Sequence, residues 1–432
     1  MPKLRSNRVV LPEGERPATI RYEDGRIVDV GDGPADHDFG DFVILPGLVD
    51  CHVHVNEPGR TEWEGFATAS AAALAGGTTT LVDMPLNSIP PTVDVAALEE
   101  KRAAARTQVH ADVAFWAGII PDSTPNVAGL VEAGVCGFKV FTVDSGVEEF
   151  PPLSPPLLAR AAGKVASTGV PLLVHAEEPS HLREPSGDPR AYVTYLVSRP
   201  AIAEAVAIDT VADLVRSRGV QAHILHVAGA EAVAAVDRSA GALSAETCPH
   251  YLTFDAASIP EGATAFKCAP PIRTAEDRES LWEALASGVL NMVVSDHSPA
   301  PPEVKELDSG NFLRAWGGIA SLELRLPATW HGAHLRGFGT SELALWLASA
   351  PSDLAGLTHR KGRIAEGMDA DFVVFDPDGE THVEARRLRQ RHPVTPYDGM
   401  RLRGAVVATF LRGTRNDDVF SEPRGELLRR GA

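Results

Sequence analysis

Cysteine is scarce in this sequence. Four cysteines occur in 432 residues, far apart and without a CxxC pair, at Cys51, Cys136, Cys248 and Cys268. This pattern is typical of reduced thiols in a cytoplasmic protein. Long apolar stretches are lacking too: no run approaches the roughly 18 residues of a membrane span, and residues 1–10 are too polar for the apolar part of a signal peptide. We therefore expect a cytoplasmic protein without a membrane segment.

Positive charge is also in short supply. Lysine and arginine number 40 against 58 for aspartate and glutamate, which gives a net charge of −18. A surface of that sign repels phosphate backbones and anionic lipids, so nucleic-acid and membrane partners are not expected. The 44% apolar and 23% charged residues are ordinary for a globular enzyme. The length allows one large barrel with an accessory domain, or three average domains.

Apolar runs alternate with alanine- and leucine-rich amphipathic stretches through the middle of the chain. Eight strands separated by helices favour an α/β fold with a parallel (β/α)8 barrel. A doubly wound open sheet is the alternative, but no glycine-rich dinucleotide turn follows the first strand. The predicted strands are Leu48–Val55, Thr78–Met84, Ala111–Gly118, Cys136–Phe141, Pro171–Ala176, Gln221–Val227, Gly241–Thr247 and Asn291–Ser295, and the predicted helices include Trp63–Ala75, Asp94–Arg106, Pro155–Ser167, Ala201–Arg218 and Ala230–Arg238.

The two ends of the chain have a different texture. Short β-like segments separated by Gly, Pro and Asp occupy residues 7–44, and similar segments return in 362–412. We expect both ends to build one small, discontinuous sheet domain. The predicted division is 1–47 for its first part, 48–363 for the barrel, and 364–432 for its second part and the tail.

The strongest local signal is the pair His52 and His54, which closes the run ILPGLVDCHVH. Residues i and i+2 of a strand point to the same face, so both imidazoles can approach one metal ion. At the carboxyl end of the first strand they lie where barrel enzymes have their active sites. A chance alternation at the surface is the plainer alternative, and the buried strand before the pair argues against it.

Two later strands carry further imidazoles. His175 ends PLLVHAE, and QAHILHVAG offers His223 and His226. Residues three apart on a strand face opposite sides, so only one of the last two can look into the barrel, and His226 is nearer the carboxyl end. Each histidine alone could be a hydrogen-bonded core residue. Asp296 ends the eighth strand, where burial is costly unless the carboxylate is paired or metal-bound; a helix N-cap is its alternative role.

Lys139 lies in the fourth strand among apolar neighbours, in GFKVF. Burying an ammonium group costs several kcal/mol without a partner, and a charged amine cannot bind a metal. Carboxylation by CO₂ would turn the amine into an anionic carbamate that can bridge two divalent cations. A lysine that extends its amine to the barrel mouth is the alternative.

This arrangement resembles the binuclear amidohydrolase superfamily, and within it the cyclic-amidase branch of dihydroorotases, hydantoinases and allantoinases. The resemblance covers nearly the whole chain and implies a small β-sandwich domain beside the barrel. The longest motifs are similar to those of allantoinases: Asn56–Phe66, Asp83–Thr92, Cys248–Tyr251, Ser295–Glu303 and Ala315–Ile319, with Gly362–Asp371 returning to the sandwich.

Two positions separate the branches, and a third argues slightly in the other direction. Dihydroorotases typically have arginine where this chain has Asn56, and hydantoinases typically have tyrosine where it has Asp144. A substrate that needs one of these side chains would bind more weakly to a site without it, because a buried hydrogen bond would stay unmade. Ala269 stands where relatives often have Ser or Asn, which is harmless only if that contact uses the backbone.

The resemblance implies hydrolysis of allantoin to allantoate by two divalent metal ions, with zinc expected and cobalt, manganese or iron as alternatives. His52 and His54 would hold one ion, His175 and His226 the other, and carbamylated Lys139 (N6-carboxylysine) would bridge them. A bridging hydroxide would attack, with Asp296 as a ligand and as general base and then acid. Cys51 should point away from the metals, and His297 is expected to support Asp296. The expected substrate-binding residues are Asn87, Cys268, Ala269, Ser298, Trp316 and Gly317.

Other readings remain open. They are a hydantoinase or dihydropyrimidinase with unusual loops, a non-catalytic scaffold that kept the barrel, and a single-metal deaminase, which would not need a bridging lysine. Relatives are commonly tetrameric, so the resemblance also implies a homotetramer.

Overall fold

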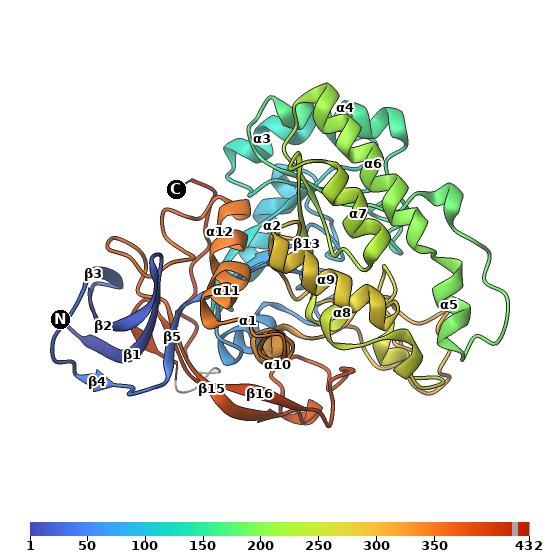
Figure 1. Cartoon of the computed structure of the whole chain (residues 1–432). Coiled ribbons are helices and arrows are strands. Elements are labelled where there is room, and N and C mark those ends of the chain that lie inside the picture. Colours follow the sequence, from blue (N-terminus) through green and yellow to red (C-terminus); the bar gives the residue numbers. More distant parts are fainter. Residues whose placement is uncertain (417–421, 432) are drawn as a thin grey trace.

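The apolar runs between residues 48 and 295 form the parallel strands of a TIM-like (β/α)8 barrel, as the alternation predicted (Figure 1). The computed structural model describes residues 1–416 and 422–431. The third predicted strand is divided at Trp116 into two short pieces. The barrel strands are β6 (Leu48–Val53), β7 (Thr78–Asp83), β8 (Asp112–Phe115), β9 (Ala117–Gly118), β10 (Phe138–Phe141), β11 (Leu172–His175), β12 (Ala222–Ile224), β13 (Leu243–Thr247) and β14 (Met292–Val293).

The barrel closes where its first strand meets the segment after its last strand. Val53 and His297 form a parallel bridge, and the N–H of His54 donates to the carbonyl of His297 over 2.8 Å. The remaining neighbours pair in parallel in chain order, from β6 to β8 and from β9 to β14. All the carboxyl ends therefore point to one mouth, where the first, fifth and eighth strands deliver their final residues.

Helices cover the outside of the barrel. Two of the predicted helices have the expected bounds, and the helix predicted from Trp63 begins at Phe66, because Gly65 has φ 107°, outside the helical region. The helices are α1 (Phe66–Ala75), α2 (Val95–Ala105), α3 (Val127–Glu132), α4 (Pro155–Ala166), α5 (Tyr192–Ser198), α6 (Ala201–Arg218), α7 (Ala230–Arg238), α8 (Pro249–Thr253), α9 (Ala275–Ser287), α10 (Arg325–Leu335), α11 (Thr340–Ala344) and α12 (Ala350–Ala355). None of the helices within the described residues is long and apolar enough to cross a membrane.

Strands from both ends of the chain build the second domain, beside the barrel (Figure 1). Antiparallel pairing of Val43 with Phe375 joins the two segments. The aromatic rings of Tyr22 and Phe372, 5.9 Å apart, meet in a separate apolar core. The strands are β1 (Lys3–Leu11), β2 (Gly14–Glu23), β3 (Arg26–Gly31), β4 (His37–Asp38), β5 (Val43–Pro46), β15 (Phe372–His382), β16 (Arg401–Leu411) and β17 (Thr414–Arg415).

The predicted fold class, a barrel with a small β-sandwich domain from both termini, is thereby confirmed. The boundaries 1–47, 48–363 and 364–432 stay predictions, and residues 417–421 and 432 of the last range lie outside the described residues.

A buried lysine joins the barrel to the returning C-terminal segment. The Nζ of Lys361 lies 2.5 Å from Asp112 of β8, 2.8 Å from Asp369 and 2.7 Å from Asp371. Asp112 also pairs with Arg412 at the end of β16. Three buried carboxylates around one ammonium form a network in which the lysine offsets repulsion between like charges.

Replacing Lys361 with methionine should lower the free energy of unfolding by about 3–5 kcal/mol, because three buried carboxylates would lose their ammonium partner. Denaturant unfolding followed by circular dichroism measures the change. The control is Lys164→Met on the exposed end of α4, expected to cost at most about 0.5 kcal/mol. Equal stability of the two variants would contradict a structural role for the network.

Candidate metal centre and active site

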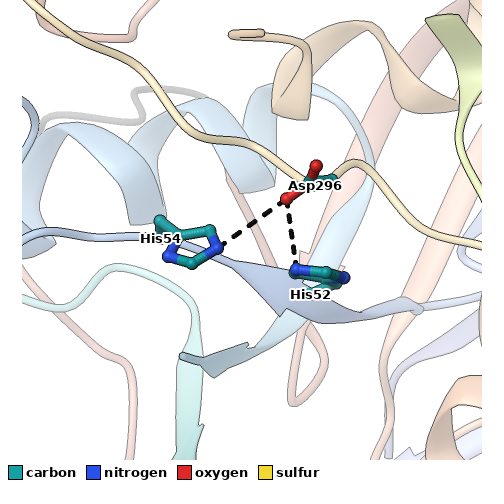
Figure 2. Close-up of side chains that lie close together, drawn as sticks. All are labelled: His52, His54 and Asp296. Atoms are coloured by element: carbon teal, nitrogen blue, oxygen red, sulfur yellow. Dashed lines mark ion pairs between the residues drawn. The ribbon is translucent and has the colours of Figure 1, made fainter. Parts of the chain in front are cut away.

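The two histidines of the HxH motif and Asp296 lie together at the barrel mouth, although strands one and eight supply them (Figure 2). The Nε2 of His52 is 3.1 Å from Oδ1 of Asp296, and the Nε2 of His54 is 3.7 Å from the same oxygen. All three residues are buried. The alternation of strand residues thus turns both imidazoles inward, whereas Cys51, which precedes His52, contacts the sulfur of Met292 at 3.7 Å.

The imidazoles of the second pair, His175 and His226, point toward each other. The Nδ1 of His175, at the end of β11, lies 3.0 Å from Nε2 of His226. The Nε2 of His175 is 2.8 Å from Glu177, which Arg199 holds with a second ion pair. Burial alone would raise the pKa of Glu177, but Arg199 and His175 lower it to about 2. The carboxylate is therefore charged, and by accepting from Nε2 of His175 it leaves the lone pair of that ring on Nδ1, the nitrogen that faces His226.

The donor set fits metal ions. The Nδ1 of His52 donates to Glu246 over 2.5 Å, and the Nδ1 of His54 donates to the carbonyl of Leu86 over 3.0 Å. With His175 on Glu177, three rings thus have one nitrogen held by an oxygen, and each presents its other nitrogen to the cavity side. Such partners fix the tautomer and orientation of histidines that bind metals. Burial lowers the pKa of all four imidazoles, which favours the neutral form that metal binding requires.

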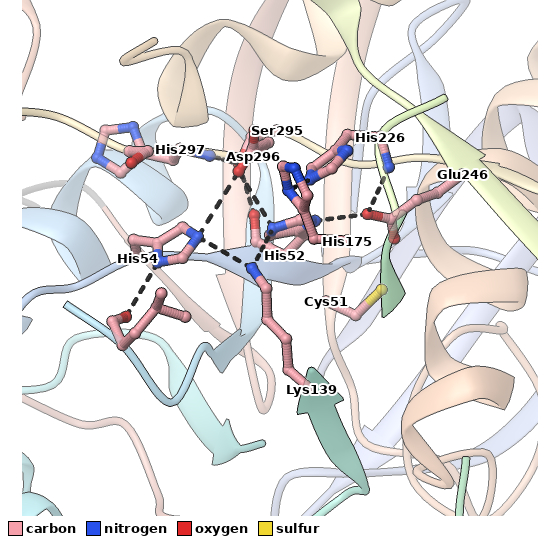
Figure 3. A network of polar contacts seen from close by, with 12 residues as sticks. Cys51, His52, His54, Lys139, His175, His226, Glu246, Ser295, Asp296 and His297 are labelled. Atoms are coloured by element: carbon pink, nitrogen blue, oxygen red, sulfur yellow. Dashed lines mark hydrogen bonds and ion pairs between the residues drawn. The ribbon is translucent and has the colours of Figure 1, made fainter. Parts of the chain in front are cut away.

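Lys139 points from β10 into this group of imidazoles (Figure 3). Its Nζ lies 3.3 Å from Nε2 of His52 and 3.5 Å from Nε2 of His54, and the side chain is only 1% exposed. Burial lowers the pKa of Lys139, and the charge of Asp296 opposes that shift. The amine therefore lies between groups that would share metal ions, and its neutral form is favoured by burial.

Asp296 has an unusual backbone as well as an unusual environment. Burial raises the pKa of its carboxyl, against the attraction of Lys139. Its φ is 43°, and His226 and Asn56, which also lie at the barrel mouth, have φ values of 38° and 68°. Residues other than glycine rarely adopt this left-handed region, and such strain gathers at functional sites.

A narrow cavity of about 50 Å³ opens onto the ligands. A surface hollow of about 600 Å³ is larger, but residues of β15 and β16 and none of the grouped ligands line it, so volume does not mark the site. Five of the six substrate-binding residues predicted from the sequence line the narrow cavity. Its lining is His54, Leu86, Asn87, Lys139, Phe141, Ser145, His175, His226, Ala269, Asp296, Ser298, Trp316 and Gly317.

Cys268 is the predicted residue that does not line the cavity. Its thiol donates to the carbonyl of Pro270 over 3.3 Å, and its own carbonyl accepts from the hydroxyl of Tyr195 over 2.7 Å. Burial raises the pKa of this thiol to about 12. The side chain therefore hydrogen-bonds to the backbone just after Ala269.

Loops after the later strands form one wall of the cavity. The indole N–H of Trp316 donates to Oγ of Ser298 over 3.2 Å. Gly318 lies so close that a Cβ on it would meet the carbonyl oxygen of Ser298 at 2.3 Å. Only glycine fits this approach, which explains the second glycine of the Gly-Gly pair that follows Trp316.

Asn56 and Asp144, the two positions that distinguish the branches, have different surroundings. The amide of Asn87 donates to Asn56 over 3.0 Å, so Asn56 holds a residue of the cavity wall. Asp144 is exposed and accepts from the N–H of Gly146, while Ser145 lines the cavity.

Sequence reasoning missed the residues that orient the ligands. Glu246 was not singled out, although it contacts His52 and also accepts from Nε2 of His223 over 3.1 Å. Of His223 and His226, His226 lines the cavity, as predicted, but β12 ends at Ile224, so the strand alternation used to choose between the two histidines does not reach His226. A buried charge at the end of a strand, as in LSAET, was the available signal for Glu246. His297 has its ring between Glu64 and the N–H of Ser321.

Comparisons with known proteins identify relatives of this chain. Residues 43–415 match the amidohydrolase family. The chain is 46% identical to an allantoinase of Streptomyces avermitilis, over 99% of this chain and 98% of the relative, and 40% identical to an allantoinase of Saccharomyces cerevisiae, over 98% of both. An L-hydantoinase (dihydropyrimidinase) structure from Arthrobacter aurescens superposes with a TM-score of 0.91 at 28% identity, covering 100% of both chains. This chain belongs to the amidohydrolase family.

Proposed function

We propose that this chain hydrolyses the hydantoin ring of allantoin to give allantoate, a step of purine catabolism. The observation that carries the proposal is the cluster of His54, His175, His226, Lys139 and Asp296 around one narrow cavity, with His52 in contact with Lys139 and Asp296. Support comes from relatives at 40–46% identity that are named allantoinases. The chemistry is the addition of water to a cyclic amide, with cleavage of one C–N bond.

Two divalent ions fit the donor set. His52, His54 and Asp296 would hold one ion, His175 and His226 the other, and zinc suits imidazole and carboxylate ligands best, with cobalt, manganese and iron also possible. When bound, such ions lower the pKa of water toward neutrality and polarise a carbonyl oxygen.

Lys139 would contribute as a carbamate. Its neutral amine adds to CO₂, one proton leaves, and the product carries two oxygens with a negative charge. Burial favours the neutral amine that this reaction needs. The modification replaces a cation 3.3 Å from the Nε2 of His52 with an anion that can bridge two cations.

Asp296 would move the proton. Its carboxylate takes a proton from the attacking water and then gives it to the ring nitrogen that leaves, because the two steps follow one another. Burial raises the pKa of this carboxyl, so its protonated form is accessible near neutral pH. Glu246 would keep the ring of His52 in place during both steps.

The cavity wall would bind and orient the substrate. Asn87, Ser298 and Trp316 present polar groups at the cavity, and Gly317 and Ala269 present small ones. Opening of hydantoin or dihydrouracil is the second candidate activity, since the fold is shared with hydantoinases. A cytoplasmic location and a homotetramer complete the proposal.

The substrate test compares allantoin with hydantoin, dihydrouracil and dihydroorotate at equal concentration, using protein supplied with divalent metal and bicarbonate. We expect allantoin to be strongly preferred and a chelator to abolish its turnover, measured as allantoate formed. Preferential opening of hydantoin or dihydrouracil would favour the second candidate. Absence of any ring opening by protein that holds two metals would favour a scaffold.

The variant Asp296→Asn should lower kcat/KM for allantoin by about 10²- to 10⁴-fold, because it removes the group that moves the proton. Steady-state kinetics and the metal content per chain are measured together, since Asp296 is also a proposed ligand. The control is Asp144→Asn in an exposed loop, for which kinetics should change little. Retention of activity within about tenfold in Asp296→Asn would rule out its proton-transfer role.

The variant Glu246→Gln should weaken metal binding by about 10- to 100-fold, because the amide cannot accept from both His52 and His223 as the carboxylate does. Metal loss against a competing chelator measures the change. Glu204→Gln is the matched control, since Glu204 is equally buried but pairs with Arg273. It should cost stability without loss of metal, and equal metal loss in both variants would contradict the assignment.

A further inference from the structure

A second group of potential metal ligands shares Asp296 with the first group. Cys248 follows β13 directly, and His250 stands in the short helix α8. One ligand atom of each, together with a carboxylate oxygen of Asp296, lies within 4.8 Å of the others, and all three residues are buried. Neither Cys248 nor His250 has a part in the proposed mechanism.

The imidazole ring of His250 is buried, and its hydrogen-bonding capacity is unused among the described residues. Its side chain has no solvent exposure, and neither ring nitrogen has a hydrogen-bond partner among the described residues. A buried polar group left in this state costs about 1–3 kcal/mol. Burial, together with the charge of Lys305, lowers the pKa of His250 to about 3, so the ring is neutral and offers a lone pair.

Asp296 has a carboxylate oxygen to share. Both of its ion pairs, with His52 and with His54, use Oδ1. Figure 2 shows the other oxygen pointing away from these two imidazoles. One carboxylate can therefore serve the proposed catalytic ion through Oδ1 and another cation through its second oxygen.

We propose that Cys248, His250 and Asp296 form an inhibitory site for a thiophilic divalent cation, such as zinc in excess or cadmium. Thiolate, imidazole and carboxylate are all zinc ligands, and a sulfur ligand selects against magnesium, calcium and manganese. The Cys248 thiol gives its proton to solvent when the cation binds.

The inhibition follows from the shared carboxylate. With its second oxygen on a cation, Asp296 is a weaker base and is held in place, so it cannot move the proton during ring opening. This consequence rests on the proposed function of Asp296, whereas cation binding itself does not.

The test titrates the metal-loaded protein with Cd²⁺. Sulfur-to-cadmium charge-transfer absorption reports binding at a thiolate, elemental analysis counts cadmium per chain, and allantoin turnover is followed in parallel. The proposed catalytic ligands include no sulfur, so exchange there gives no such band. We expect one thiolate-bound cadmium per chain, inhibition along the same titration curve, and no inhibition by Mg²⁺.

Two variants and a matched control identify the ligands. Cys248→Ser should lose the band and the inhibition. His250→Gln should weaken cadmium binding by about 10-fold or more, because replacing a residue that only hydrogen-bonds to a metal ligand already costs about that much. Cys136→Ser replaces another fully buried thiol, outside the cluster, and should behave as the unaltered protein does.

Persistence of the band in Cys248→Ser, or unchanged cadmium affinity in His250→Gln, would overturn the site, as would absence of a band in the unaltered protein. The spectrum of the unaltered protein tests the site even if a variant fails to fold. A charge-transfer band in protein that opens no allantoin would retain the site and remove the proposed function. Allantoin turnover without any band would do the reverse.

Discussion

The first and eighth strands of the barrel meet through the bridge between Val53 and His297, and the candidate site depends on this contact. It brings Asp296 to within 3.1 Å of His52, although more than half of the chain separates them. Arg325 stabilises the same junction, because its guanidinium donates to the carbonyls of Val49 and Val293 on the two strands. A barrel that failed to close here would leave each ligand on a separate edge.

Closure of the barrel also buries ionisable groups, and the proposed chemistry uses the resulting shifts of their pKa values. Lys139, Asp296 and Glu246 are buried. Burial lowers the pKa of the Lys139 amine and raises the pKa of the two carboxyl groups, so it favours the neutral form of each. Desolvation of this kind is unfavourable unless other groups share the charge. Metal ions and a carbamate would supply that sharing. The strained backbone of Asp296 indicates that the fold, rather than local preference, holds the carboxylate over the imidazoles.

Much of the site could be predicted because its residue types are rare in apolar strands. His52 and His54 follow a two-residue alternation, and Lys139 interrupts a buried strand, so each is visible within a few residues of sequence. Glu246 and Glu177 escaped notice because their importance lies in contacts with His52 and His175. Those contacts are made between strands or in a loop, where spacing along one segment carries no information.

Local sequence by itself determined the alternation of strands and helices, the discontinuous sheet domain and the identity of the proposed ligands, because hydrophobic period and residue chemistry are local properties. Only the tertiary structure decided which nitrogen of each ring faces the cavity, that Cys268 lies outside its lining, and that His250 is buried near Asp296 with no hydrogen-bond partner in the described part of the chain. The orientation of a side chain at the end of a strand depends on neighbours from other strands, and these become neighbours only when the barrel closes.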